Sequence, residues 1–167
     1  MSADGPGRSR NTDRNTPALT VQVATRSRSL PATAQLRRWT RAALARPAQV
    51  TLRIVGEREG ESLNRKFRRK PYATNVLTFG YTEDGGLAGD IAGDIVLCAP
   101  VIAREARRQR KDLEAHYAHL TVHGLLHLQG YDHENSREAR IMEAREAAIL
   151  KRLGYPDPYA GEEGRLG

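Results

Sequence analysis

Four short stretches of the chain predict β-strands, and apolar and polar residues alternate in the first two of them. The stretches cover 18–24, 49–55, 74–81 and 91–99. Elsewhere the chain predicts five helices, the first two from apolar residues three or four positions apart and the last three from the start signals Pro100, Asp112 and Asn135. These helices cover 31–45, 57–67, 100–110, 112–129 and 135–154. Strands that alternate with helices and lead into a helical end indicate an α+β domain, with a small mixed sheet covered by helices.

The polar ends of the chain suggest a single domain over 18–160. Residues 1–17 are rich in Ser, Asn, Asp, Arg and Gly and lack the apolar centre of a signal peptide, so we expect a disordered tail and a cytoplasmic protein. A short C-terminal tail is expected at 161–167, and the Gly-rich stretch 83–89 predicts an exposed loop. No run of 18 apolar residues occurs, so no association with a membrane is expected.

Charge changes this picture by pointing to a polyanionic partner. The 167 residues include 27 Lys and Arg against 20 Asp and Glu, for a formal net charge of +7. Basic residues gather at 65–70, at 104–111, and at Arg37, Arg38 and Arg41. Each group alone is typical of a solvated helix face, but together they can hold a phosphate backbone. Aromatic residues make up only 5%, so extensive base stacking is not expected.

The chain has one cysteine, Cys98, which excludes an internal disulfide and a cysteine-rich metal site. We expect Cys98 to be a small buried residue of a strand. Metal chemistry, if present, must therefore come from other side chains.

All five histidines lie between His116 and His133. His123 and His127 are four residues apart in a predicted helix, so their imidazoles project from one face and can share one zinc ion. Gly130 is the expected end of that helix, after which the chain turns and His133 can return as a third ligand. Three protein ligands leave the fourth tetrahedral position open, which is the arrangement of a catalytic zinc site.

The spacing of these histidines also matches the metzincin metalloproteases. Those enzymes place a glutamate directly after the first histidine as the general base, and this chain has Gly124 there. A zinc metallopeptidase is therefore an alternative that lacks its base. His119, one turn before His123, is either a solvated residue or a group that supports a ligand or contacts substrate.

Four segments resemble the YbeY family of bacterial endoribonucleases of rRNA maturation. They are HGLLHLQGYDH (123–133), LNRKFRRKPYATNVLTFGY (63–81), AGDIVLCAPVI (92–102) and the ending LGYPDPY. The resemblance spans roughly 19–159 and implies an α+β fold, with a four-stranded mixed β-sheet, about five α-helices, and the zinc site on a central helix and the following turn. The chain departs from the family in its polar N-terminal tail and in Arg69, where a glycine is common.

The resemblance implies a single-strand-specific zinc endoribonuclease that acts in late-stage 70S ribosome quality control and 16S rRNA 3′-end maturation. It implies one Zn²⁺ per chain, with His123, His127 and His133 as the metal ligands. The family pattern LNxx[FYW]R falls on Arg68, which becomes the predicted catalytic residue together with the metal-binding His123. The implied partners are single-stranded RNA, 16S rRNA and the small ribosomal subunit, and the protein is expected to be a monomer.

In this hypothesis zinc polarises a phosphoryl oxygen, and Arg68 neutralises the charge that develops on the phosphate. The residues leave open whether water or the RNA 2′-hydroxyl attacks. A third interpretation is a non-catalytic ribosome-assembly factor with a structural zinc. That role needs a fourth protein ligand, for which Asp132 is the nearby candidate, although a turn residue is the favoured role for Asp132.

Overall fold

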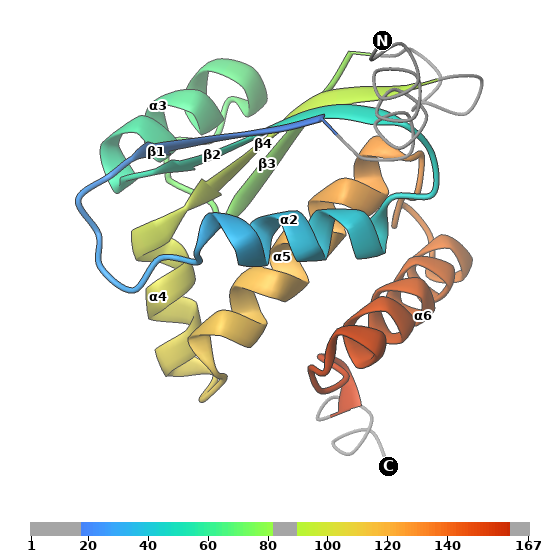
Figure 1. Cartoon of the computed structure of the whole chain (residues 1–167). Coiled ribbons are helices and arrows are strands. Elements are labelled where there is room, and N and C mark those ends of the chain that lie inside the picture. The colour runs from blue at the N-terminus through green and yellow to red at the C-terminus, as the bar shows by residue number, and fades with distance from the viewer. Residues whose placement is uncertain (1–17, 82–89, 161–167) are drawn as a thin grey trace, which may run out of the picture.

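The computed structural model describes residues 18–81 and 90–160 (Figure 1). The predicted tails, 1–17 and 161–167, and the predicted loop, 83–89, lie outside the described residues. The strands are β1 (Ala18–Ala24), β2 (Ala48–Val55), β3 (Val76–Gly80) and β4 (Ile91–Cys98). The helices are α2 (Thr33–Ala43), α3 (Glu57–Arg68), α4 (Ala99–Arg108), α5 (Leu113–Leu128) and α6 (Ser136–Leu153).

The four strands form one mixed sheet in the order β1-β2-β4-β3. β1, β2 and β4 are parallel, and β3 runs antiparallel to β4 at the edge. Parallel neighbours need a crossover connection, and α2 supplies the one between β1 and β2. The predicted α+β fold, with a four-stranded mixed sheet and five helices, is confirmed.

Helices cover both faces of the sheet (Figure 1). α2 and α5 lie on one face and enclose the larger core, with α6 packed on these two helices. α3 lies on the other face, over a smaller cluster of Val55, Leu77, Val96 and Cys98. Cys98 is buried with a free thiol, as its place in a strand predicts. None of the described helices combines the length and the apolar character needed to cross a bilayer.

α5 is the central helix and is enclosed on almost every side. From His116 to Leu128 every residue is buried except His119, His123 and His127, which form a single stripe four residues apart. A helical segment that is apolar around nearly its whole circumference must lie inside a domain, and from His116 onwards α5 leaves only its histidine stripe partly exposed.

The ends of α5 and α6 follow the predicted signals closely. α5 ends at Leu128, and Gly130 adopts a φ of 96°, the left-handed conformation expected there. Gly154 ends α6 in the same way, with a φ of 94°. The predicted capping box at Asn135 is half formed: its side chain accepts a hydrogen bond from the Glu138 amide at 2.9 Å, but Glu138 Oε2 has no partner within the described part of the chain.

Candidate metal centre

The structure brings the three predicted ligands together. His123 and His127 face each other across one turn of α5, with their Nε2 atoms 3.1 Å apart. His133 arrives from the turn after α5, and its ring centroid lies 5.7 Å from that of His123 and 5.0 Å from that of His127. One nitrogen from each of the three rings lies within 4.8 Å of the other two.

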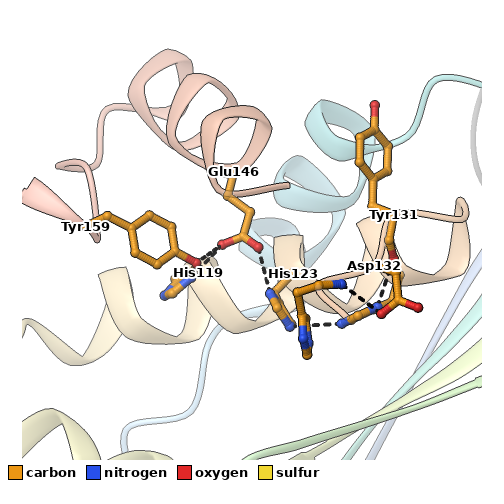
Figure 2. Close-up of polar contacts among 8 residues, drawn as sticks. His119, His123, Tyr131, Asp132, Glu146 and Tyr159 are labelled. Carbon is orange, nitrogen blue, oxygen red and sulfur yellow. Dashed lines mark hydrogen bonds and ion pairs between the residues drawn. The ribbon is translucent and has the colours of Figure 1, made fainter. Parts of the chain in front are cut away.

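Hydrogen bonds orient two of these rings (Figure 2). His123 Nδ1 donates to Glu146 Oε1 at 2.6 Å, and His127 Nδ1 donates to the Tyr131 carbonyl oxygen at 3.0 Å. In a neutral imidazole with a protonated Nδ1, Nε2 carries a lone pair. The two facing Nε2 atoms therefore repel each other unless a cation lies between them.

The spacing of the facing atoms fits a metal ion. A tetrahedral zinc ion with Zn–N bonds of about 2.0–2.1 Å holds its ligand nitrogens about 3.3 Å apart, close to the separation of the two Nε2 atoms. Metal binding also requires neutral imidazoles. Burial lowers the pKa of His127, and the neighbouring His123 and His133 lower this pKa further, which favours the neutral ring.

The carboxylate that accepts the hydrogen bond from His123 Nδ1 is buried. Glu146, on α6, is 0% exposed, and its Oε2 accepts hydrogen bonds from His119 Nε2 at 2.8 Å and from the Tyr159 hydroxyl at 2.5 Å. Burial by itself raises the pKa of Glu146, but hydrogen bonds from His119, His123 and Tyr159 outweigh it and lower this pKa to about 2. His119 is thus joined to a ligand through Glu146, which is one of the two roles considered for it.

Sequence reasoning missed Glu146 and Tyr159. A signal for Glu146 was present, because it lies on the apolar face of its helix. The buried residues of that face are Met142, Glu146, Ile149, Leu150 and Leu153. A charged residue among apolar positions at helical spacing needs a partner, since burying an unpaired charge is costly.

The structure does not bring Arg68 to the histidines. Arg68 is the last residue of α3, on the face of the sheet opposite α5, and it is exposed. Among the described contacts none joins its side chain to the three rings. The next residue, Arg69, has a φ of 57°, in the left-handed region that favours glycine, which gives a physical reason for the glycine common there in the family. The catalytic role of Arg68 stays a prediction.

The structure also places Gly124, on which the peptidase alternative depends, and Asp132, on which the structural-zinc alternative depends. Gly124 faces the sheet, where an added Cβ would lie 3.1 Å from Thr78 Cγ2 and 3.2 Å from Ile95 Cδ1, so this position cannot supply a peptidase base. Asp132 accepts a hydrogen bond from the His133 amide at 2.8 Å, which is a turn role. In the described ranges Asp132 groups with other carboxylates, and not with the three histidines.

The three histidines lie at an open surface. His133 is exposed, and the His123 side chain is 23% exposed. A cavity of about 660 Å³ lies further towards the start of α5, where its lining includes His116 and His119 but none of the three predicted ligands. An open position suits a polymeric substrate better than a small molecule enclosed in a pocket.

Together, the mixed sheet and the stripe on α5 define a small α+β protein with a candidate three-histidine metal centre that has one open side. A family model described as Endoribonuclease YbeY matches residues 20–154. The chain therefore belongs to the YbeY endoribonuclease family.

Individual relatives agree with the family model. A protein of Nitrosospira multiformis named Endoribonuclease YbeY is 57% identical over 155 residues, covering 86% of this chain and 82% of the relative. One of Nitrosomonas eutropha with the same name is 58% identical over 141 residues, covering 84% and 97%. A solution structure of a Thermotoga maritima protein matches with a TM-score of 0.56 and 20% identity, covering 87% of this chain and 93% of that one, which supports the fold alone.

Proposed function

We propose that this chain is a single-strand-specific, zinc-dependent endoribonuclease that acts in 16S rRNA 3′-end maturation and late-stage 70S ribosome quality control. Membership of the YbeY family makes the chain an enzyme that hydrolyses RNA phosphodiester bonds. The observation that supports the metal-dependent part is the pair of facing Nε2 atoms of His123 and His127, with His133 beside them.

The roles of the residues follow from their chemistry. His123, His127 and His133 would hold the ion, and a bound zinc would polarise a phosphoryl oxygen and lower the pKa of a bound water to about 7. Arg68 would place its guanidinium against the phosphate and neutralise the charge that develops there. The attacking oxygen comes from water or from the RNA 2′-hydroxyl, and these differ in the product ends.

Exposed basic and aromatic side chains support a single-stranded RNA substrate. All six residues of Arg65–Lys70 are exposed, and five of them are basic. The ion pair of Arg65 with Glu61, at 2.8 Å, is exposed and weak enough to yield to a phosphate. Phe67, Tyr72 and Tyr81 are each more than half exposed. These aromatic faces are few, but unpaired bases of a short RNA segment can stack on them, whereas paired bases cannot.

Metal analysis and RNA cleavage, run together on the wild type and His127→Ala, test this proposal. We expect about one zinc per wild-type chain and cleavage of single-stranded RNA in preference to a duplex, with both zinc and cleavage lost in the variant. A 2′,3′-cyclic phosphate end indicates attack by the 2′-hydroxyl. Zinc and cleavage retained in His127→Ala would contradict the site, and zinc-dependent cleavage of unfolded protein in place of RNA would favour the peptidase.

The ribosomal part has its own test in cells. Replacing the chromosomal copy with the His127→Ala version should leave 16S rRNA with extended 3′ ends and allow defective 70S ribosomes to accumulate. Mapping the 3′ ends measures the first effect, and gradient sedimentation followed by RNA analysis measures the second. Mature 16S ends in cells that carry only the variant would contradict this role while leaving RNA cleavage itself intact.

A further inference from the structure

We infer that Glu146 is a positioning residue of the metal centre: it holds His123 with Nε2 turned towards the metal, and His119 and Tyr159 hold Glu146 in place. This inference rests on the proposed function, because it requires His123 to be a metal ligand. Figure 2 shows the arrangement, with Glu146 between the Tyr159 ring and His123.

The first step is the proton on His123. Glu146 is completely buried, and its Oε1 lies 2.6 Å from His123 Nδ1. An ionised carboxylate only accepts hydrogen bonds, so the imidazole must donate and Nδ1 must carry the proton. Nε2 is then the atom with the lone pair, and it is the atom that faces His127 at 3.1 Å. A neutral histidine without such a partner distributes its proton over both nitrogens and loses this orientation.

The second step is what fixes the carboxylate itself. Oε2 accepts from His119 Nε2 at 2.8 Å and from the Tyr159 hydroxyl at 2.5 Å, so donors from α5 and from the segment after α6 meet on one oxygen. His119 makes this bond although its buried Nδ1 is left without a partner in the described residues. A buried polar atom without a partner is costly, and Nδ1 has no partner that would favour a proton on it. The contact with Glu146, to which Nε2 must donate, therefore decides the tautomer of His119.

The same side chains could in principle form a second cation site, since donor atoms of His119, His123 and Glu146 lie within 4.8 Å of one another. The hydrogen bonds argue against this. Both carboxylate oxygens already accept from N–H or O–H groups, and a cation would have to displace those protons. We therefore expect one metal ion per chain and a supporting role for Glu146.

Zinc affinity of the full chain, measured by competition with a chromophoric chelator, tests the inference. Glu146→Gln should bind zinc about 10–100-fold more weakly, the usual loss when a hydrogen-bond partner of a metal-bound histidine is changed. Tyr159→Phe should weaken binding by a smaller factor, since His119 still holds Oε2. Glu105→Gln is the matched control: Glu105 pairs with the buried His116 at 2.9 Å, in the same chemistry but away from the ligands, and its variant should bind as the wild type does.

Nitrogen NMR of the metal-free protein adds a readout that a merely structural glutamate would not change. We expect protonated Nδ1 on His123 in the wild type and a mixture of tautomers in Glu146→Gln. If Glu146→Gln kept the wild-type zinc affinity and the wild-type tautomer of His123, the inference would be overturned while the proposed function stood. The same holds if the wild-type chain bound two zinc ions and Glu146→Gln lost only one of them. A wild type that binds no zinc would overturn both the inference and the proposed metal site. Should Glu146→Gln fail to fold, a wild-type zinc affinity in Tyr159→Phe would overturn the inference.

Discussion

The histidine stripe of α5 and the basic segment Arg65–Lys70 differ in how the fold treats their side chains. His123 and His127 project from the largely buried 116–128 part of α5, and a hydrogen bond orients each ring. The basic segment ends α3 on the opposite face of the sheet, and every one of its side chains is exposed. Its described side-chain contacts are an exposed ion pair of Arg65, the position of Lys66 over the Phe67 ring at 5.2 Å, and an edge-to-face contact of Phe67 with Phe79 at 5.1 Å.

This difference separates two kinds of binding. A metal ion requires nitrogen atoms held within tenths of an ångström, and buried partners such as Glu146 provide that precision. A flexible RNA strand requires charge over a broad surface, and long side chains in water can adjust to it. Changes at the stripe should therefore abolish metal binding, whereas changes in the basic segment should weaken RNA binding in a graded, salt-dependent way.

Substitution of Arg68 should give the largest loss of cleavage rate outside the metal ligands. Arg68 belongs to the basic segment, yet its predicted role is at the metal centre. If its planar fork contacts a phosphate lodged at the metal, Arg68→Ala should lower the cleavage rate by on the order of 10²–10³-fold. Arg68→Lys should recover only part of the rate, because it keeps the charge but loses the fork. Both variants should fold and hold zinc normally. Single-turnover rates at saturating enzyme measure this effect without differences in binding.

Arg65→Ala is the matched control for Arg68, because Arg65 is exposed on the same helix about one turn earlier. Its single-turnover rate should stay near that of the wild type. A near wild-type rate for Arg68→Ala would refute its catalytic role and leave the three histidines as the predicted catalytic machinery. Equal losses in both variants would point to a general effect of charge.

Salt dependence should show a smaller, graded effect of the basic segment. Replacing Arg65, Lys66 and Lys70 with Ala and Arg69 with Gly should reduce the slope of log affinity against log salt by up to about 3, at roughly 0.7 for each RNA phosphate that the variant no longer neutralises. Gly is used for Arg69 because of its φ of 57°. Fluorescence anisotropy with a single-stranded RNA at several salt concentrations measures the slope, and zinc content should not change.

A matched variant in the second basic segment shows whether position matters or only charge. Arg107, Arg108 and Lys111 would be changed to Ala, and Arg110, with a φ of 54°, to Gly. The slope should change less in this variant. If instead the first variant keeps the wild-type slope and the second loses it, the RNA path lies along 104–111.

The sequence predicts the fold and the three histidines because both depend on spacing within single elements. Short apolar stretches, two of them alternating, predicted the four strands. The interval between His123 and His127, with Gly130 after them, predicted two rings on one helix face and a turn that returns His133. Glu146 could not be placed beside His123, because that contact depends on how α6 packs against α5. Arg68 remains unplaced relative to the RNA for a different reason, since an exposed arginine has no packing that fixes its direction.

In the region around the histidine stripe, the contact between α5 and the sheet should tolerate added side-chain volume least. A substitution at Gly124 tests this. An added Cβ would lie 3.1 Å from Thr78 Cγ2 and 3.2 Å from both Cγ2 and Cδ1 of Ile95. In an open helix, Gly→Ala should stabilise by about 1 kcal/mol. Overpacking of a tight core costs about 1–3 kcal/mol and opposes that gain.

We therefore expect Gly124→Ala to lower the free energy of unfolding by about 1 kcal/mol, with zinc content and cleavage rate unchanged, because the added Cβ meets the sheet residues Thr78 and Ile95. Urea denaturation of the metal-free protein measures this change. Ile95→Val removes Cδ1, so the double variant should lose less stability than the sum of the two single variants, by about 0.5–1 kcal/mol. A stabilised Gly124→Ala would show that Ile95 and Thr78 move aside easily. The absence of a side chain at 124 would then have no basis in packing, while the lack of a general base at this position would stand, because glycine carries no group that can move a proton.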